Sequence, residues 1–235
     1  MISFIWQWLD CFYTFPVTCL VIVICVVVWL LITHKGWSYY DVGCNYDRVL
    51  VDKETWRWIS STLSHISWMH LVLNMYSLWN LRWMEQRFTC SVYLIWNILI
   101  AFLSTCVTLF INLLQLWVGF HTEQVRQVYL VGYSAVLFGL FAIASQHVTS
   151  IVLLGDILIA PIWIPFISLG VVTLLVPEAS FVGHCSGIFI GFLISLDKHD
   201  DLFQWSWSWI WLLGILCITL ITMNWTIQRN RFIRI

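Results

Sequence analysis

Two short stretches, Gly132-Tyr133-Ser134-Ala135 and Gly183-His184-Cys185-Ser186-Gly187, decide which fold this chain can adopt. Each places one reactive side chain, a serine hydroxyl or an imidazole, among small residues inside an apolar segment. Small residues recur every four positions, at 135 and 139 and again at 183, 187 and 191, so each set lies on one helical face. Such faces let two membrane helices pack closely. The sequence therefore predicts two packed helices that bring Ser134 to His184.

The composition is that of a membrane protein. Of the 235 residues, 61% are hydrophobic and 10% are charged, and the mean hydropathy is +0.87. A bilayer crossing needs roughly 20 apolar residues. Seven windows without Asp, Glu, Lys or Arg approach or exceed that length: 11–34, 58–81, 88–122, 127–155, 157–177, 179–196 and 202–228. We expect an all-α, polytopic membrane protein with seven spans, give or take one.

Composition also excludes several classes of protein. The net charge is −1 and the acids and bases are scattered, so no basic patch indicates a nucleic-acid partner. The eight cysteines include no CxxC pair, and several lie in apolar windows, where thiols behave as small hydrophobic groups. We expect no nucleic-acid partner, no metal site and no cofactor.

The second apolar window carries three polar side chains, His65, His70 and Asn74. His70 and Asn74 are four residues apart on one helical face, whereas His65 lies five residues before His70, off that face. Polar groups at membrane depth are costly and face a cavity or a partner helix. One interpretation makes His70 and Asn74 hydrogen-bonding groups between helices. The other makes them donors to a developing oxyanion.

Polar connections flank this second helix. Residues 35–57 form the longest of them and predict a structured loop ending in Trp56-Arg57-Trp58, an aromatic and basic sequence typical of a membrane interface. Glu85-Gln86-Arg87 follows the helix and predicts a structural ion pair.

The region from 148 to 177 predicts a loop followed by a short helix. Residues 148–160 are apolar apart from Asp156 and indicate a partly embedded loop. Pro161 and Pro165 suit a helix start, where the missing N–H costs nothing, and the helix ends before Pro177. A short helix bounded by prolines is a candidate moving part.

The polar residues of the apolar windows together suit hydrolysis inside a membrane. Such chemistry needs a nucleophile, a base and donors for an oxyanion. We interpret Ser134 as the nucleophile, His184 as the base, and His70 with Asn74 as the donors. Gly132, which lacks a Cβ, lets the chain turn sharply before the serine.

The order and context of these residues resemble the rhomboid intramembrane serine proteases. The matching pieces are Trp56-Arg57, His65, the stretch from His70 to Asn74, Glu85-Gln86-Arg87, Gly132 to Ala135, and Gly183-His184 followed by Gly187 and Gly191. They cover roughly residues 55 to 195. Ser134 to Phe138 and Ala179 to His184 look most like the endoplasmic-reticulum rhomboid-domain-containing subgroup.

The resemblance implies a six-helix protease domain over residues 1–201, followed by a seventh transmembrane helix and a short basic tail at 202–235. It implies a Ser–His dyad without a third acid, in a water-filled cavity. Ser134 would attack the scissile carbonyl of a transmembrane segment while His184 moves the proton. The Ser134 backbone N–H, His70 and Asn74 would hold the oxyanion, supported by Gly132 and His65.

The resemblance also implies a cellular setting. The partners would be the lipid bilayer and transmembrane segments of substrate proteins, which enter beside the fifth helix. The chain would be a multi-pass protein of the endoplasmic reticulum or another endomembrane. A cavity that opens away from the cytosol conflicts with the positive-inside tendency, because a tail with three arginines would follow seven spans. Either residues 202–225 do not span, or the tendency fails here.

Two alternatives stay open at this point. A catalytically silent rhomboid-like protein would bind and escort membrane clients, although such proteins typically lack the serine or the histidine. Ala135, where the family more often has glycine, adds a methyl group beside Ser134. A transporter is disfavoured because no ionisable pair or inverted repeat occupies matching positions in two halves.

Overall fold

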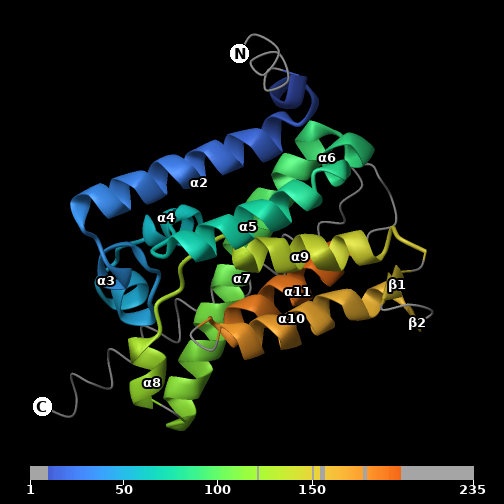
Figure 1. The fold of residues 1–235 in the computed structure, drawn as a ribbon. Helices are drawn as coiled ribbons and strands as arrows, with labels where there is room; N and C mark the ends of the chain where they lie inside the picture. Colours follow the sequence, from blue (N-terminus) through green and yellow to red (C-terminus); the bar gives the residue numbers. More distant parts are fainter. Residues whose placement is uncertain (1–9, 121, 150, 154–156, 177–178, 197–235) are drawn as a thin grey trace, which may run out of the picture.

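A computed structural model describes residues 10–120, 122–149, 151–153, 157–176 and 179–196 (Figure 1). In chain order the elements are α2 (Pro16–Lys35), α3 (Tyr39–Val42), the π-helical turn η1 (Asp47–Val51), α4 (Arg57–Leu63), α5 (Trp68–Asn80), α6 (Trp83–Phe88), α7 (Cys90–Val118), α8 (Thr122–Gln127), α9 (Ser134–Ser145), the strands β1 (Ile151–Leu153) and β2 (Ile157–Ile159), the 3₁₀ turn η2 (Pro161–Trp163), α10 (Ile164–Leu175) and α11 (Phe181–Ser195). The helical fold class is confirmed. The expected seventh helix lies outside the described residues.

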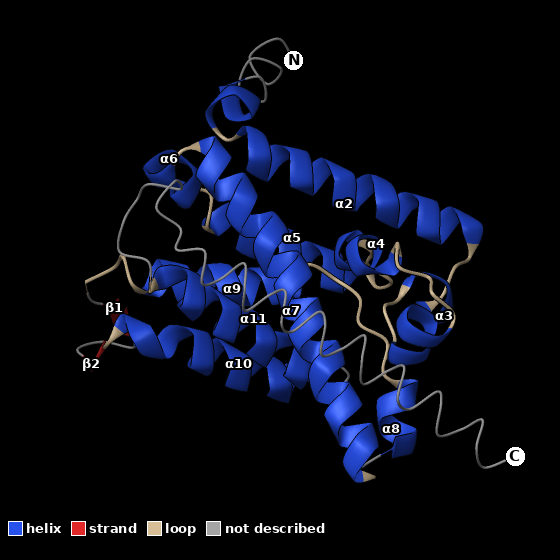
Figure 2. Ribbon diagram, turned by 180° about the vertical axis from the view of Figure 1, so that it is seen from behind, coloured by secondary structure: helices blue, strands red, loops and turns tan. Residues whose placement is uncertain are grey.

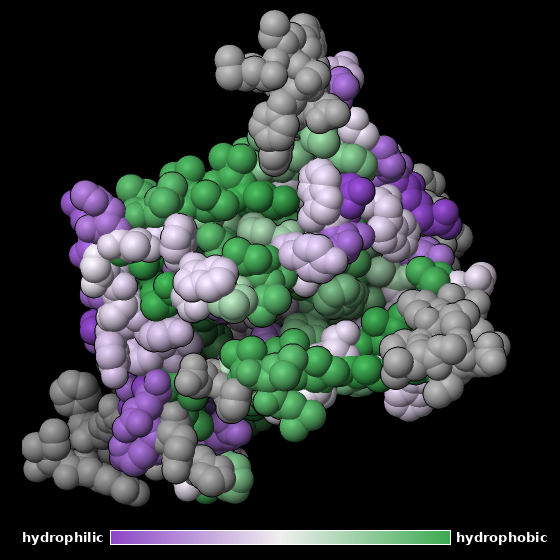
Figure 3. Space-filling view, in the orientation of Figure 1, coloured by the Kyte–Doolittle hydropathy of each residue, from purple (hydrophilic) through white to green (hydrophobic). Residues whose placement is uncertain are grey.

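Apolar helices make up most of the described chain. Among them, α2 and α7 are long and apolar enough to cross a bilayer, and α9, η2 with α10, and α11 are shorter apolar helices. Figure 3 shows hydrophobic residues spread over α2 and α10, with hydrophilic residues gathered over α6 at one end and around α8 at the other. This pattern fits an apolar belt between two polar boundaries.

The close packing expected from the small residues is present between α9 and α11, which lie side by side in both ribbon views (Figures 1 and 2). A Cβ added at Gly187 would overlap the carbonyl oxygen of Ala135, and one added at Gly191 would overlap that of Gly139. The backbones therefore touch directly. Because both contacts follow the same order along the chain, the two helices run in the same direction.

Helix α7 fastens both members of this pair by hydrogen bonds between buried side chains. Tyr133, just before α9, donates its hydroxyl to Asn97 Oδ1 at 2.6 Å. Thr108 Oγ1 donates to Ser186 Oγ on α11 at 3.0 Å. Buried polar groups need such partners. These bonds therefore set the position of α7 along the axes of α9 and α11.

Glu85 binds the first turn of α2 instead of forming the ion pair that the sequence predicted. Its side chain is 1% exposed and accepts bonds from the Val17 N–H at 2.7 Å, the Thr18 N–H at 3.0 Å and the Thr18 hydroxyl at 2.8 Å. Amides at a helix start lack helical acceptors and carry a partial positive charge, so a carboxylate satisfies both. Among the described residues, no cation pairs with Glu85.

The loop between α2 and α4 is structured, as predicted, because it is bonded to the segment that leads into α9. The Asn45 amide donates to the carbonyls of Arg126 and Val128, both at 2.8 Å. Cys44 and Leu130 exchange two backbone bonds of 2.9 and 2.8 Å. These contacts tie the first loop to the residues just before Gly132.

The Arg57 side chain is buried against this loop. Its side chain is 4% exposed, donates to the Gly43 carbonyl at 2.9 Å and pairs with Glu54. Its neighbour Trp56 is 54% exposed and retains the outward position expected of an interfacial residue. The arginine therefore holds the loop together, and only the tryptophan faces out.

The predicted loop 148–160 contains a short antiparallel hairpin. Residues 151–153 pair with 157–159, with Val152 opposite Leu158. Both strands consist of Ile, Val and Leu, which favour extended backbone, and Gly155-Asp156 stands between them in the sequence. Pro161 then begins the turn η2, and α10 continues from Ile164.

The α9–α11 contact predicts that Gly187→Ala is destabilising. The added methyl overlaps backbone that cannot move aside, so we expect a loss of about 1–3 kcal/mol in the free energy of unfolding, measured by thermal or denaturant unfolding in detergent. Gly170→Ala on α10 is the matched control, because a Cβ there meets nothing within 4 Å. Equal stability of the two variants would contradict the packing argument.

Candidate active site

Ser134 and His184 both lie in the first turn of their helices. Gly132, with φ of +108°, makes the turn that places Ser134 at the start of α9. The Ser180 hydroxyl caps α11 by accepting a hydrogen bond of 3.1 Å from the N–H of Gly183, the residue before His184. Since the two helices run in the same direction, their first turns lie next to each other at the same end of the helix pair.

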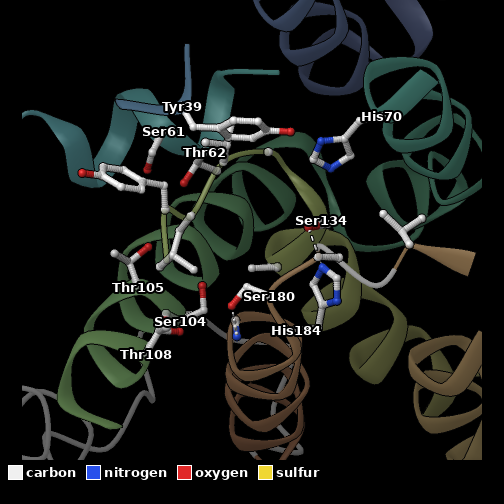
Figure 4. A pocket seen from close by; sticks show the side chains of 18 of the residues that line it. Tyr39, Ser61, Thr62, His70, Ser104, Thr105, Thr108, Ser134, Ser180 and His184 are labelled. Atoms are coloured by element: carbon white, nitrogen blue, oxygen red, sulfur yellow. Dashed lines mark hydrogen bonds between the residues drawn. The ribbon is translucent and has the colours of Figure 1, made fainter. Parts of the chain in front are cut away.

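A hydrogen bond of 2.8 Å joins Ser134 Oγ and His184 Nε2 (Figure 4). The imidazole is 4% exposed. The ring of Phe138, one turn along α9 from the serine, packs on it with a centroid separation of 4.4 Å and an interplanar angle of 34°. In the part of the chain that the structure describes, no carboxylate is hydrogen-bonded to His184. Orientation of the imidazole therefore comes from packing.

The pair faces a cavity of about 220 Å³. On the side away from His70 the cavity is lined by hydroxyl groups, from Ser61 and Thr62 on α4 and from α7 (Figure 4). The α7 hydroxyls are those of Ser104, Thr105 and Thr108. A cavity of this size with hydroxyl groups in its lining can hold water, so a water molecule has a place beside the serine.

His70, on α5, lines the cavity opposite Ser134 (Figure 4). Its ring lies so close to Gly132 that a Cβ there would overlap the imidazole. Gly132 is thus required both for its positive φ and for the approach of His70. The turn at Gly132 leaves the space that the His70 ring occupies, so a larger residue at position 132 would displace that ring.

His65 supports His70 from a position that the sequence pattern did not indicate. The sequence placed it on the second helix, but α5 begins only at Trp68, and Ser64 and Ser67 have extended backbone angles. The break turns the His65 ring edge-on toward His70, with centroids 5.1 Å apart. His65 Nε2 also accepts a long bond of 3.5 Å from the Tyr133 N–H.

Asn74 is near the site but does not line its cavity. Its side chain is 4% exposed, and its amide donates to the His70 carbonyl at 2.8 Å. The amide group is therefore committed to its own helix in this conformation. Of the predicted site residues, the structure brings Ser134, His184, His70 and Gly132 to the cavity, and places His65 and Asn74 behind His70.

Tyr39 is a cavity residue that sequence reasoning missed. It belongs to α3, and its hydroxyl points toward His70 over the cavity (Figure 4). The turn is fixed by Asp41, which accepts the Ser38 N–H at 2.7 Å and the Ser38 hydroxyl at 2.8 Å. These bonds stabilise the carboxylate and lower the pKa of Asp41. No spacing rule links this loop to the serine 95 positions later.

No group of three His, Cys, Asp or Glu side chains in the described residues could hold a metal ion. The chemistry available at the cavity is that of a hydroxyl, an imidazole and hydrogen-bond donors.

Fold and site together define a helical membrane protein with a hydrogen-bonded serine–histidine pair at a cavity lined in part by hydroxyl groups. The Rhomboid domain family matches residues 52–200, which is more than half of the chain. The chain therefore belongs to the rhomboid family.

Named relatives agree with this assignment. Rhomboid-type serine protease 2 of Yarrowia lipolytica is 28% identical over 184 residues, covering 76% of this chain and 58% of that protein. Rhomboid-like protein 15 of Arabidopsis thaliana is 27% identical over 180 residues, covering 74% and 45%. Rhomboid-like protein 14, mitochondrial, of the same plant is 27% identical over 154 residues, covering 65% and 46%. The chain spans about half the length of these relatives.

The pair predicts a reactive serine. A fluorophosphonate probe should label the folded protein at Ser134, and His184→Asn should slow labelling by at least about 10²-fold because the base is lost. Ser104→Ala removes another hydroxyl from the same cavity and should leave the labelling rate unchanged. Labelling that persists in Ser134→Ala would place the reactive group elsewhere.

Proposed function

We propose that this protein is an intramembrane serine endopeptidase that cleaves transmembrane segments of membrane proteins. The observation that carries the proposal is the 2.8 Å bond between Ser134 and His184 at a cavity that hydroxyl groups line in part, among apolar helices. The name of the Yarrowia relative, a serine protease, supports the same activity. A protein with these parts can form and hydrolyse an acyl-enzyme without a metal or cofactor.

In this mechanism His184 Nε2 takes the proton of the Ser134 hydroxyl as Oγ attacks the scissile carbonyl. The tetrahedral intermediate collapses when the imidazolium gives that proton to the leaving amine. A water then enters from the hydroxyl-lined side of the cavity, loses a proton to His184 and hydrolyses the ester. Packing by Phe138 holds the imidazole in place through both half-reactions.

The oxyanion would lie between the start of α9 and α5. The Ser134 N–H belongs to the first turn of α9, where amides have no helical acceptor and the helix dipole favours negative charge. His70 faces this point across the cavity and supplies a second donor. Asn74 and His65 support His70 from behind, and Gly132 leaves room for its ring.

Substrate entry is proposed beside α10. Its contact with α11 includes side-chain rings, such as Phe166 on Phe192 at a centroid separation of 5.8 Å, whereas α9 and α11 meet backbone to backbone. Side-chain contacts can part and re-form at lower cost than interlocked backbones. A substrate helix could therefore reach Ser134 by displacing α10 while the pair stays intact.

The proposal also includes the domain boundaries, the cellular location and the partners of the protease. Residues 1–201 would form the catalytic domain and 202–235 a seventh span with a basic tail. The protein would act as a multi-pass protein of the endoplasmic reticulum or another endomembrane. Its partners would be membrane-protein substrates within the bilayer.

Cleavage of a model transmembrane substrate by purified protein tests the activity. We expect product from the native chain and none above background from Ser134→Ala or His184→Ala, both of which should retain the native unfolding temperature. A folded native protein that yields neither product nor serine labelling would reject the protease. Capture of uncut clients by that protein would then support a client-binding role, and Ala135→Gly would test whether the methyl group blocks catalysis.

The oxyanion assignment predicts that His70→Ala lowers kcat by about 10²–10³-fold with little change in KM, because the lost donor acts mainly in the transition state. His34→Ala is the control, since His34 is exposed at the far end of α2. A raised KM at unchanged kcat would instead assign His70 to substrate binding.

A further inference from the structure

A second concave site lies at the opposite end of α9 from Ser134. This groove is shallow and wide open, with a volume of about 580 Å³, and is lined by Trp83, Gln86 and Arg87 of α6 and by His147 and Val148 just after α9. Helix α9 has 12 residues, so the groove is roughly 18 Å from the serine along the helix axis. It is therefore separate from the proposed catalytic cavity.

Among the described residues, the polar groups that line the groove include hydrogen-bond donors and no carboxylate. Arg87 contributes a guanidinium, Gln86 an amide and Trp83 an indole N–H. The nearest acid in sequence, Glu85, is 1% exposed and accepts its bonds from the start of α2. Among the ion pairs of the described residues, none includes Arg87. The groove thus presents positive charge that no described acid neutralises.

One buried ring contacts both Arg87 and His147. Phe88 is 8% exposed. Its ring lies 5.5 Å from the Arg87 guanidinium carbon and 4.6 Å, edge to face, from the ring of His147. A cation–π contact holds a guanidinium without removing its charge or its N–H groups. Arg87 and His147 are thus held on one ring, next to the same groove.

The position of the groove favours a lipid. It lies at the end of α5, α6 and α9, where Figure 3 shows hydrophilic residues bordering the apolar surface. Trp83 and Val148 place apolar surface beside the donors, and tryptophan is enriched at the level of lipid headgroups. Arginine suits phosphate because its planar N–H groups match two phosphate oxygens. Basic pockets at the ends of membrane helices bind anionic headgroups.

We propose that the groove of Trp83, Gln86, Arg87, His147 and Val148 binds the phosphate of an anionic phospholipid, with an acyl chain along the adjoining apolar surface. A free anion would use the donors but not the apolar part of the groove. The inference does not depend on proteolysis.

Lipid titration of purified Ser134→Ala protein in a neutral detergent tests the site independently of any cleavage. Phosphatidylglycerol should form a one-to-one complex in native mass spectrometry and raise the unfolding temperature, whereas phosphatidylcholine and inorganic phosphate should do neither. Arg87→Gln should bind phosphatidylglycerol about fivefold more weakly, as expected for one lost cationic contact at a membrane surface.

Lys35→Gln is the charge-matched control. Lys35 is exposed at the other end of α2, about 30 Å along the helix from the turn held by Glu85. The proposal is overturned if Arg87→Gln and Lys35→Gln bind phosphatidylglycerol equally, or if phosphatidylcholine binds as well. If inorganic phosphate bound equally well, the groove would be a general anion site, and the proposed lipid specificity would be wrong.

Discussion

Direct backbone contact between α9 and α11 is the constraint on which the rest of the site depends. Gly187 and Gly191 have no side chain to separate the helices, so each packs on a carbonyl of α9. A helix pair held apart by leucines would be several ångströms wider. The direct contact of the two backbones therefore brings the side chains of Ser134 and His184 within hydrogen-bonding distance.

Hydrogen bonds between helices add to the stabilisation that the close packing of α9 and α11 provides. Within a bilayer, apolar side chains gain little by leaving lipid for protein, so helices associate through close packing and hydrogen bonds. The bonds from α7 to Tyr133 and Ser186, together with the Glu85 carboxylate on α2, serve this purpose. The bonds of Asn45 extend it to the loop before Gly132. The start of α9 is thus held from several sides, whereas α10 contacts α9 and α11 through side chains such as Leu169 and Phe166.

Sequence alone predicted the parts that follow local rules. The four-residue spacing of small residues predicted the packed pair, and a serine among small neighbours predicted the start of α9. The features it missed depend on contacts between distant segments. Glu85 was expected to form an ion pair because no pattern reveals that the amides of Val17 and Thr18 lie beside it. His65 was misplaced because the break at Ser64 to Ser67 follows no proline or glycine, and Tyr39 reaches the cavity only through the folded first loop.

The parallel packing of α9 and α11 also determines when the pair of Ser134 and His184 can form during synthesis of the protein. Ser134 and His184 are 50 residues apart in the chain. At roughly 5–20 residues per second, the ribosome delivers the histidine about 3–10 seconds after the serine. Throughout that interval the nascent chain holds a serine without its partner. The pair forms only once α11 packs against α9, so the site is incomplete until the helices of the newly made chain are assembled.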